Sequence, residues 1–254
     1  MRRVLALAIV LAAGRAAAHV APAIGDNNRY LKLTPLGDRI RLSYTVLYGA
    51  VPAAGMRRAI DANHDGTIDD AERREFGDRV AREVASAIEL TIDGARRPVA
   101  WSQVEVGLGT PRTAAGPFSI DLVAWICLAS PRGKHAVVLR DDFHLERPGE
   151  TEVRVEDSPG VAIDATRIGG AEDDTNDYNL VGPSGALATY GLELQFTANA
   201  RAPVPPDGTC AGPDASRTSR ALPTGAIGGA IGGACALAVV GIVIARRRRR
   251  GRRR

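Results

Sequence analysis

Short stretches in which apolar and polar residues alternate are the feature that most restricts the fold of this 254-residue chain. In residues 39–47 every second side chain is apolar, which places one set on a single strand face: Ile40, Leu42, Tyr44 and Val46. Similar strands are predicted over residues 30–33, 88–92, 99–106, 118–128, 135–139, 151–155 and 187–196. Turn-forming pairs such as Asp93-Gly94 separate several of them. The pattern predicts a mainly β fold, an antiparallel β-sandwich.

Helical spacing interrupts this pattern in the first half of the chain. Residues 70–87 carry apolar side chains at helical intervals and begin with acidic residues, which suit a helix N-terminus. Only a short helix is expected over residues 52–60, because Pro52 and Gly55 disfavour a longer one. A helix–loop–helix insertion at about residues 52–87 is therefore predicted between two strands.

The loop between these helices, residues 61–72, carries oxygen ligands at the spacing that calcium requires. Calcium takes six to eight oxygens, so the chain must wrap around it with alternate residues pointing inward. Gly66 permits the sharp bend at the sixth place of the loop. Ile68 is expected to turn into the apolar core and His64 to face solvent. The predicted ligands are the side chains of Asp61, Asn63, Asp65, Asp69 and Glu72 and the main-chain carbonyl of Thr67.

This pattern resembles the EF-hand family over about thirty residues, and the resemblance implies Ca²⁺ as the bound ion. EF-hand sensors generally work as pairs, with the residue equivalent to Ile68 bridging two loops. The sequence contains no second loop of this kind. A fixed structural ion is therefore expected, a clip that neutralises the loop carboxylates, rather than a switch that opens a groove.

The two ends of the chain predict export and anchoring. Residues 1–18 have two early arginines, a short apolar run and small residues before His19, the order of a cleaved signal peptide. Residues 224–245 contain no charge and are long enough to span a bilayer, and the arginine-rich tail 246–254 should stay in the cytoplasm. Between these lie an exported domain, residues 19–198, and a stalk rich in Pro, Ala, Ser and Gly, residues 199–223. The predicted location is the cell envelope, with one membrane span.

The charge distribution argues against nucleic acid as a partner. Of the 33 Lys and Arg residues, 11 lie in the signal segment and the tail, where no acidic residue occurs. The exported part therefore sets 22 basic against 29 acidic residues. An acidic domain suits a cation-binding protein. In the span, Gly225, Gly229 and Gly233 recur at the spacing of helix dimers, so a homodimer is one interpretation and a plain glycine-rich span is the other.

Three cysteines are too few for a disulfide framework in a chain of this length. Cys235 lies inside the predicted span and Cys210 in the stalk. The simplest interpretation makes Cys127 a buried free thiol on a strand. A bridge between Cys127 and Cys210 is the alternative in an oxidising compartment.

Three weaker metal sites have less support than the 61–72 loop. After cleavage, His19 and the new amino terminus would offer nitrogen ligands for copper or nickel. The acidic run 172–177 offers oxygens without a recognised spacing. Asp142, His144 and Glu146 alternate on a predicted strand face and would suit a transition metal. No nucleophile or phosphate-loop motif occurs, so no catalytic residues are assigned and a non-enzymatic role is expected.

Residues 28–94 also resemble the exported N-terminal domain of bacterial nickel- and cobalt-type membrane transporters. The resemblance rests on the segments 28–33, 38–46 and 90–94 around the loop. It implies an envelope domain, without the multi-helix membrane part that would carry transport. The function expected is a membrane-anchored calcium-binding module for adhesion, scaffolding or binding of an unknown envelope protein. The alternatives are a periplasmic nickel- or copper-handling accessory that uses His19, and a hydrolase with an unrecognised site.

Overall fold

The computed structural model describes residues 25–172, 178–181 and 185–202, and Cys210. The predicted signal peptide, His19, the span, the arginine tail and most of the stalk lie outside these residues. The described chain is mainly β, with antiparallel sheets and few helices, as the sequence predicts. No helix in these ranges combines the length and the apolar character needed to cross a membrane.

Within the described residues, twelve strands form two sheets of six. The spatial order of the first sheet is β11 (Asn179–Leu180), β8 (Pro148–Val155), β1 (Asn27–Pro35), β2 (Arg39–Tyr48), β6 (Phe118–Cys127) and β5 (Trp101–Gly107). The order of the second is β10 (Ala171–Glu172), β9 (Val161–Ile168), β12 (Leu192–Ala198), β7 (Gly133–Asp141), β3 (Ile88–Ile92) and β4 (Ala95–Arg97). All pairs are antiparallel except β1 with β8.

The alternation of apolar residues places one side of each sheet in a shared core. On β2 the side chains of Ile40, Leu42, Tyr44 and Val46 are all buried, as the sequence predicts. They join inward-facing residues of the second sheet, such as Leu90 and Leu139, in one hydrophobic cluster. Apolar burial of this kind is the main stabilising contribution to such a fold.

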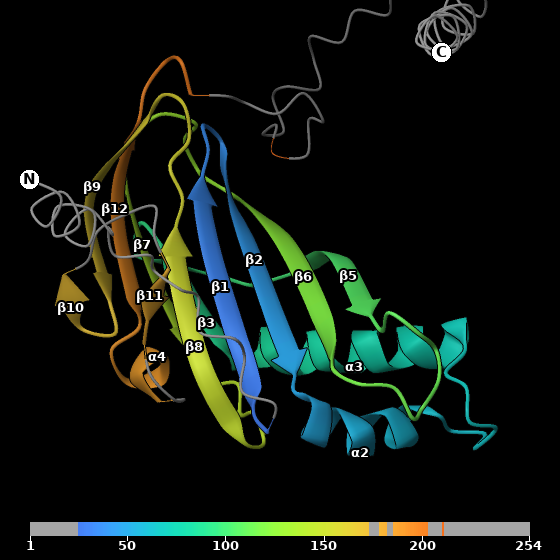
Figure 1. The fold of residues 1–254 in the computed structure, drawn as a ribbon. Coiled ribbons are helices and arrows are strands. Elements are labelled where there is room, and N and C mark those ends of the chain that lie inside the picture. Colours follow the sequence, from blue (N-terminus) through green and yellow to red (C-terminus); the bar gives the residue numbers. More distant parts are fainter. Residues whose placement is uncertain (1–24, 173–177, 182–184, 203–209, 211–254) are drawn as a thin grey trace, which may run out of the picture. The chain divides into compact units, whose positions relative to one another are not determined.

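Two helices are inserted between β2 of the first sheet and β3 of the second (Figure 1). These are α2 (Ala50–Ile60) and α3 (Asp70–Ala87). Helix α3 has the predicted bounds, and it buries Phe76, Val80 and Val84 at helical spacing. Phe76 packs against the rings of Tyr48 and Phe118, at ring-centre distances of 6.3 and 5.9 Å. The helix therefore covers the part of the first sheet built from β2, β6 and β5.

Two predicted segments differ from the structure. The strand predicted over residues 187–196 is divided into the short helix α4 (Ala186–Thr189) and β12, because Gly191 adopts a φ of 72° that interrupts an extended chain. Residues 142–146 form no strand. The Asp141 carboxylate accepts a hydrogen bond from the Phe143 amide, a local turn that ends β7.

Cys127 and Cys210 form a disulfide, with their Cα atoms 5.3 Å apart. The interpretation of Cys127 as a free thiol is therefore wrong, and the alternative pairing is the one observed. The bridge joins the end of β6 to a residue 83 positions later, beyond the last strand. It ties the chain that follows β12 to the end of β6, the strand beside the edge strand β5 of the first sheet.

Candidate metal centre

The 61–72 loop begins where α2 ends and is closed by the first turn of α3, at the lower right of Figure 1. Asp61 is the C-terminal cap of α2, and its amide donates to the carbonyl of Arg57 at 3.2 Å. Its side chain is buried, with the residue only 4% exposed. The carboxylate at the first ligand position is thus fixed to the rigid end of a helix.

The main chain of the loop folds around its own carboxylates. Asp61 accepts hydrogen bonds from the amides of Asp65 (3.2 Å) and Gly66 (2.9 Å). Asp65 accepts from the amide of Thr67 at 2.8 Å and from the side-chain amide of Asn63 at 3.2 Å. Each carboxylate oxygen has two lone pairs, so a bonded oxygen can still act as a ligand. These bonds hold the side chains of the first, third and fifth ligand positions within one turn.

Gly66 supplies the bend that the sequence predicts. Its φ is 86°, in the left-handed region that glycine enters without steric cost. His64 also has a positive φ, 60°, and its side chain is exposed, as expected for a residue that is not a ligand. The two residues reverse the chain and return Thr67 towards Asp65.

Asp69 and Glu72 close the loop through a reciprocal cap at the start of α3. The Asp69 carboxylate accepts from the amides of Ala71 and Glu72, at 2.7 and 2.9 Å, while Glu72 Oε2 accepts from the Asp69 amide at 3.0 Å. Glu72 Oε1 reaches across the loop to the amides of Ala62 and Asn63, at 2.8 and 3.2 Å. Both ends of the loop are therefore joined through the carboxylate of Glu72, the last predicted ligand.

The middle of the loop pairs with residues 111–113, in the connection between β5 and β6. Thr67 and Arg112 form an antiparallel bridge, in which the Ile68 amide donates to the Pro111 carbonyl at 2.8 Å and the Thr113 amide to the Gly66 carbonyl at 3.1 Å. In an extended chain the polar groups of successive residues point to opposite edges. The carbonyl of Thr67 consequently points away from Arg112, to the same side as the Thr67 amide that bonds Asp65. Ile68 is buried in the core, as predicted.

The donor set fits a hard cation. Three aspartates and one glutamate of the loop are predicted ligands, and none of these four takes part in an ion pair among the residues that the structure describes. Within the same residues, no three His, Cys, Asp or Glu side chains form a group that would hold a metal by themselves. The predicted set also includes the Asn63 side chain and the Thr67 carbonyl, oxygen ligands that calcium accepts and zinc or copper does not prefer.

Sequence reasoning missed Arg57 and residues 108–116. Arg57 lies in the last turn of α2 and is fully buried. Its guanidinium contacts main-chain carbonyls of the β5–β6 connection, a segment in which only Leu108 is buried. No sequence pattern marks such contacts, because carbonyl groups are the same in every residue.

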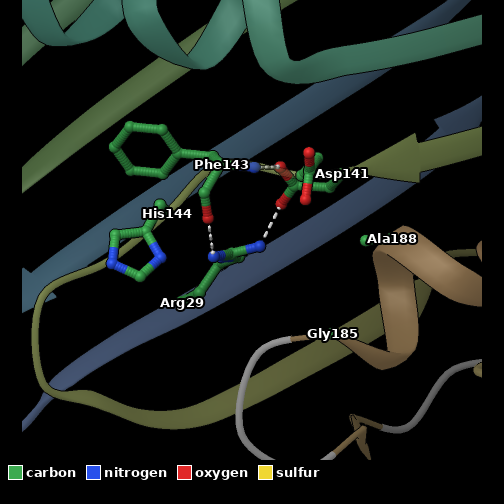
Figure 2. A pocket seen from close by; sticks show the side chains of 7 residues that line it. Arg29, Asp141, Phe143, His144, Gly185 and Ala188 are labelled. Atoms are coloured by element: carbon green, nitrogen blue, oxygen red, sulfur yellow. Dashed lines mark hydrogen bonds and ion pairs between the residues drawn. The ribbon is translucent and has the colours of Figure 1, made fainter.

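A second polar centre lies between the sheets, beside a pocket of about 350 Å³ (Figure 2). Arg29 of β1 donates to the Asp141 carboxylate and to the Phe143 carbonyl, both at 2.5 Å. The hydroxyl of Tyr44 on β2 donates to the same carboxylate at 2.9 Å. Burial, reinforced by the Asp141 charge, raises the pKa of Tyr44, so this hydroxyl stays protonated. Arg29 and Asp141 neutralise each other in the wall of the pocket.

The transition-metal hypothesis for Asp142, His144 and Glu146 rested on a shared strand face, which the structure does not contain. These residues lie in the connection between β7 and β8, and all three are exposed. Asp142 and His144 line the pocket, whereas Glu146 does not. Figure 2 shows His144 beside Arg29. Most of the acidic run 172–177 and the whole of His19 lie outside the described residues.

Neither a comparison with protein-family models nor one with curated proteins gives a match for this chain.

Proposed function

We propose that this chain is an exported, membrane-anchored calcium-binding module, in which the ion is a structural clip that holds the helix–loop–helix insertion on the β domain. The ligands are the side chains of Asp61, Asn63, Asp65, Asp69 and Glu72 and the carbonyl of Thr67. Calcium supplies the positive charge that these four carboxylates lack among their described neighbours. The module would present its β domain to a protein partner of the cell envelope, as an adhesion or scaffold component.

The observation that carries this proposal is the conformation of the loop. Its amides turn inward onto Asp61 and Asp65, Gly66 takes a left-handed conformation, and Glu72 joins the two ends. Residues 61–72 carry four carboxylates that have no ion-pair partner among the described residues, so their mutual repulsion destabilises the loop when no cation is bound. A cation removes that repulsion.

An exported site needs only a weak affinity for calcium. The Cys127–Cys210 disulfide supports an oxidising compartment, which agrees with the predicted signal peptide. Outside the cytosol calcium is abundant, so a dissociation constant on the order of 10⁻⁴ to 10⁻³ M would keep the site filled. The ion would then remain bound under all ordinary conditions and act in stability rather than in signalling.

Substitution Glu72→Gln tests the proposal. The amide keeps the shape of the side chain but removes a charge and one carboxylate oxygen, so calcium titration of the full-length chain should show binding weakened by about tenfold or more. The melting temperature of the variant should fall further below that of the wild type in millimolar calcium than in chelator, where only the hydrogen bonds of one carboxylate oxygen are lost. Glu75→Gln is the matched control, because Glu75 is an exposed residue of the same helix outside the ligand set.

Two results would contradict the clip. Equal destabilisation by Glu72→Gln in calcium and in chelator would mean that the loop holds no ion in practice. Nickel or copper binding about a hundredfold tighter than calcium, and lost with His19→Ala, would favour the metal-handling alternative. Titrating all three ions against the same preparation compares them directly.

A further inference from the structure

Arg57 is a buried cation close to the candidate metal loop, and it is not one of the predicted ligands. It is 0% exposed, and the structure gives it hydrogen bonds to four main-chain carbonyls of one segment. These are Leu108 (2.5 Å), Thr110 (2.9 Å), Arg112 (3.2 Å) and Gly116 (3.0 Å). Its guanidinium also lies over the Phe118 ring, 5.3 Å from the ring centre. A planar group with five donors can gather carbonyls in this way, whereas a lysine has three donors at one point.

The segment that Arg57 gathers, residues 108–116, has little packing of its own. Leu108 is its one buried residue, and the remaining side chains are exposed or partly exposed. Two backbone hydrogen bonds lie within it, from Thr110 to Leu108 and from Ala115 to Arg112. A segment with few apolar contacts depends on its hydrogen bonds for a defined conformation. Arg57 supplies four of them.

The 61–72 loop holds the same segment from the other side. Ile68 donates to the Pro111 carbonyl, and Thr113 donates to the Gly66 carbonyl through its amide and, at 3.2 Å, through its hydroxyl. Pro111, Arg112 and Thr113 are therefore held between Arg57 and the middle of the loop.

We propose that Arg57 is a positioning residue of the calcium site, and that it acts through residues 108–116. Arg57 fixes the 108–116 segment, the segment fixes Gly66 and Ile68, and the carbonyl of Thr67 between them is thereby aimed at the ion. The inference rests on the proposed calcium function. Because coupling between two sites is reciprocal, calcium must in turn stabilise the 108–116 segment.

The first test is the calcium affinity of Arg57→Lys in the full-length chain. Lysine keeps the buried charge and loses the planar fork, so the dissociation constant measured by calorimetry should rise by about 10- to 100-fold, as for other groups that orient metal ligands. Arg58→Lys is the matched control, since Arg58 is the exposed neighbour on α2 and should leave the affinity unchanged. Unchanged affinity in Arg57→Lys would overturn the inference while leaving the calcium clip intact.

The second test begins with hydrogen exchange of the wild-type chain with and without calcium. Calcium should slow exchange in peptides that contain Ile68 and Thr113, whose amides form the bridge. In Arg57→Lys the protection of Thr113 should be lost even at saturating calcium, an effect that general destabilisation would not confine to this segment. Calcium binding without added protection at Thr113 would overturn the inference. If the wild type binds no calcium, the proposed function fails and this coupling fails with it.

Discussion

Arg29 and Arg57 show two ways in which this fold accommodates a buried charge. Burying a charge is costly unless it is paired or fully hydrogen-bonded. Arg29 meets the carboxylate of Asp141, so the pair is neutral and joins β1 to the end of β7. Arg57 instead meets four carbonyl dipoles, and burial lowers its pKa, although an arginine still keeps its charge. The first arrangement links the two sheets, and the second links a helix to a loop.

Substitutions around Asp141 should separate a lost hydrogen bond from a lost charge. In Tyr44→Phe the carboxylate keeps Arg29 and the Phe143 amide, so the free energy of unfolding should fall by about 1.5–3 kcal/mol, the value of a hydrogen bond to a charged group. In Arg29→Met the carboxylate is left buried without its cation, and the loss should be about 3–5 kcal/mol. Urea unfolding in chelator measures both. Equal losses would contradict the buried ion pair.

Glu156 should contribute stability that is lost in acid. Burial alone would raise the pKa of Glu156, but the hydroxyl of Thr34 and the charges of Lys32 and Arg41 outweigh it and hold the pKa below its usual value. A carboxyl whose pKa is lower in the folded state stabilises the protein above its unfolded pKa of about 4.3. That contribution is lost as the pH falls through the folded pKa.

The melting temperature of Glu156→Gln should therefore lie below that of the wild type at pH 6, and the two should converge as the pH falls below about 4. The comparison is made in chelator, so that titration of the 61–72 loop does not contribute. Glu105→Gln, at an exposed position on β5, is the control. A constant difference between Glu156→Gln and the wild type across this range would show that the ionisation of Glu156 does not contribute to stability.

Helices and strands were predicted correctly where the spacing of apolar residues follows one clear period, helical or alternating. Helix α3 has the predicted bounds because helical spacing of its buried residues coincides with a capping box at Asp69 and Glu72. Strand β9 was missed because burial along Val161–Ile168 follows no simple alternation, with full burial only at Thr166 and Ile168. The short strands β10 and β11 were also missed, since two residues are too few to show any period.

The candidate metal loop could be predicted from the sequence, but the main-chain contacts that hold it in place could not. Ligand positions are set by side-chain type at fixed spacing, so Asp61, Asn63, Asp65 and Asp69 are visible in the sequence. The support comes from main-chain groups more than forty residues away, brought together only when β5 and β6 pair beside the helices. The residues around the loop do not indicate that β5 and β6 pair beside the helices. The sequence therefore does not show that residues 111–113 pair with the middle of the loop.

At the scale of the whole molecule, the candidate metal centre lies on the crossing between the sheets. The chain leaves β2 of the first sheet, passes through α2, the loop and α3, and enters β3 of the second. Residues 108–116 then return to the loop from β5, at the edge of the first sheet. An ion held in the loop would thus stabilise the connection between the sheets and an edge of one of them, without entering the shared core.

The Cys127–Cys210 disulfide provides a test of stability that is independent of the ion. Cys127 ends β6, a strand of ten residues, whereas the 108–116 segment precedes the start of that strand at Phe118. At about 3.3 Å per residue the two ends of β6 are roughly 30 Å apart. Reduction removes a constraint on an 83-residue separation, so the free energy of unfolding should fall by about 2–5 kcal/mol.

Calcium affinity should stay unchanged by reduction, because the bridge and the loop lie at opposite ends of β6. Calorimetry with and without reductant measures the calcium affinity. Guanidinium unfolding with and without reductant measures the loss of unfolding free energy, and the Cys127→Ser variant should show the same loss without reductant.

Thiol labelling under denaturing conditions provides the control. Of the three cysteines, at most one should react before reduction. Two or more reactive thiols in the purified chain would contradict the bridge. A fall in calcium affinity on reduction would instead show that β6 transmits strain along its length to the 108–116 segment.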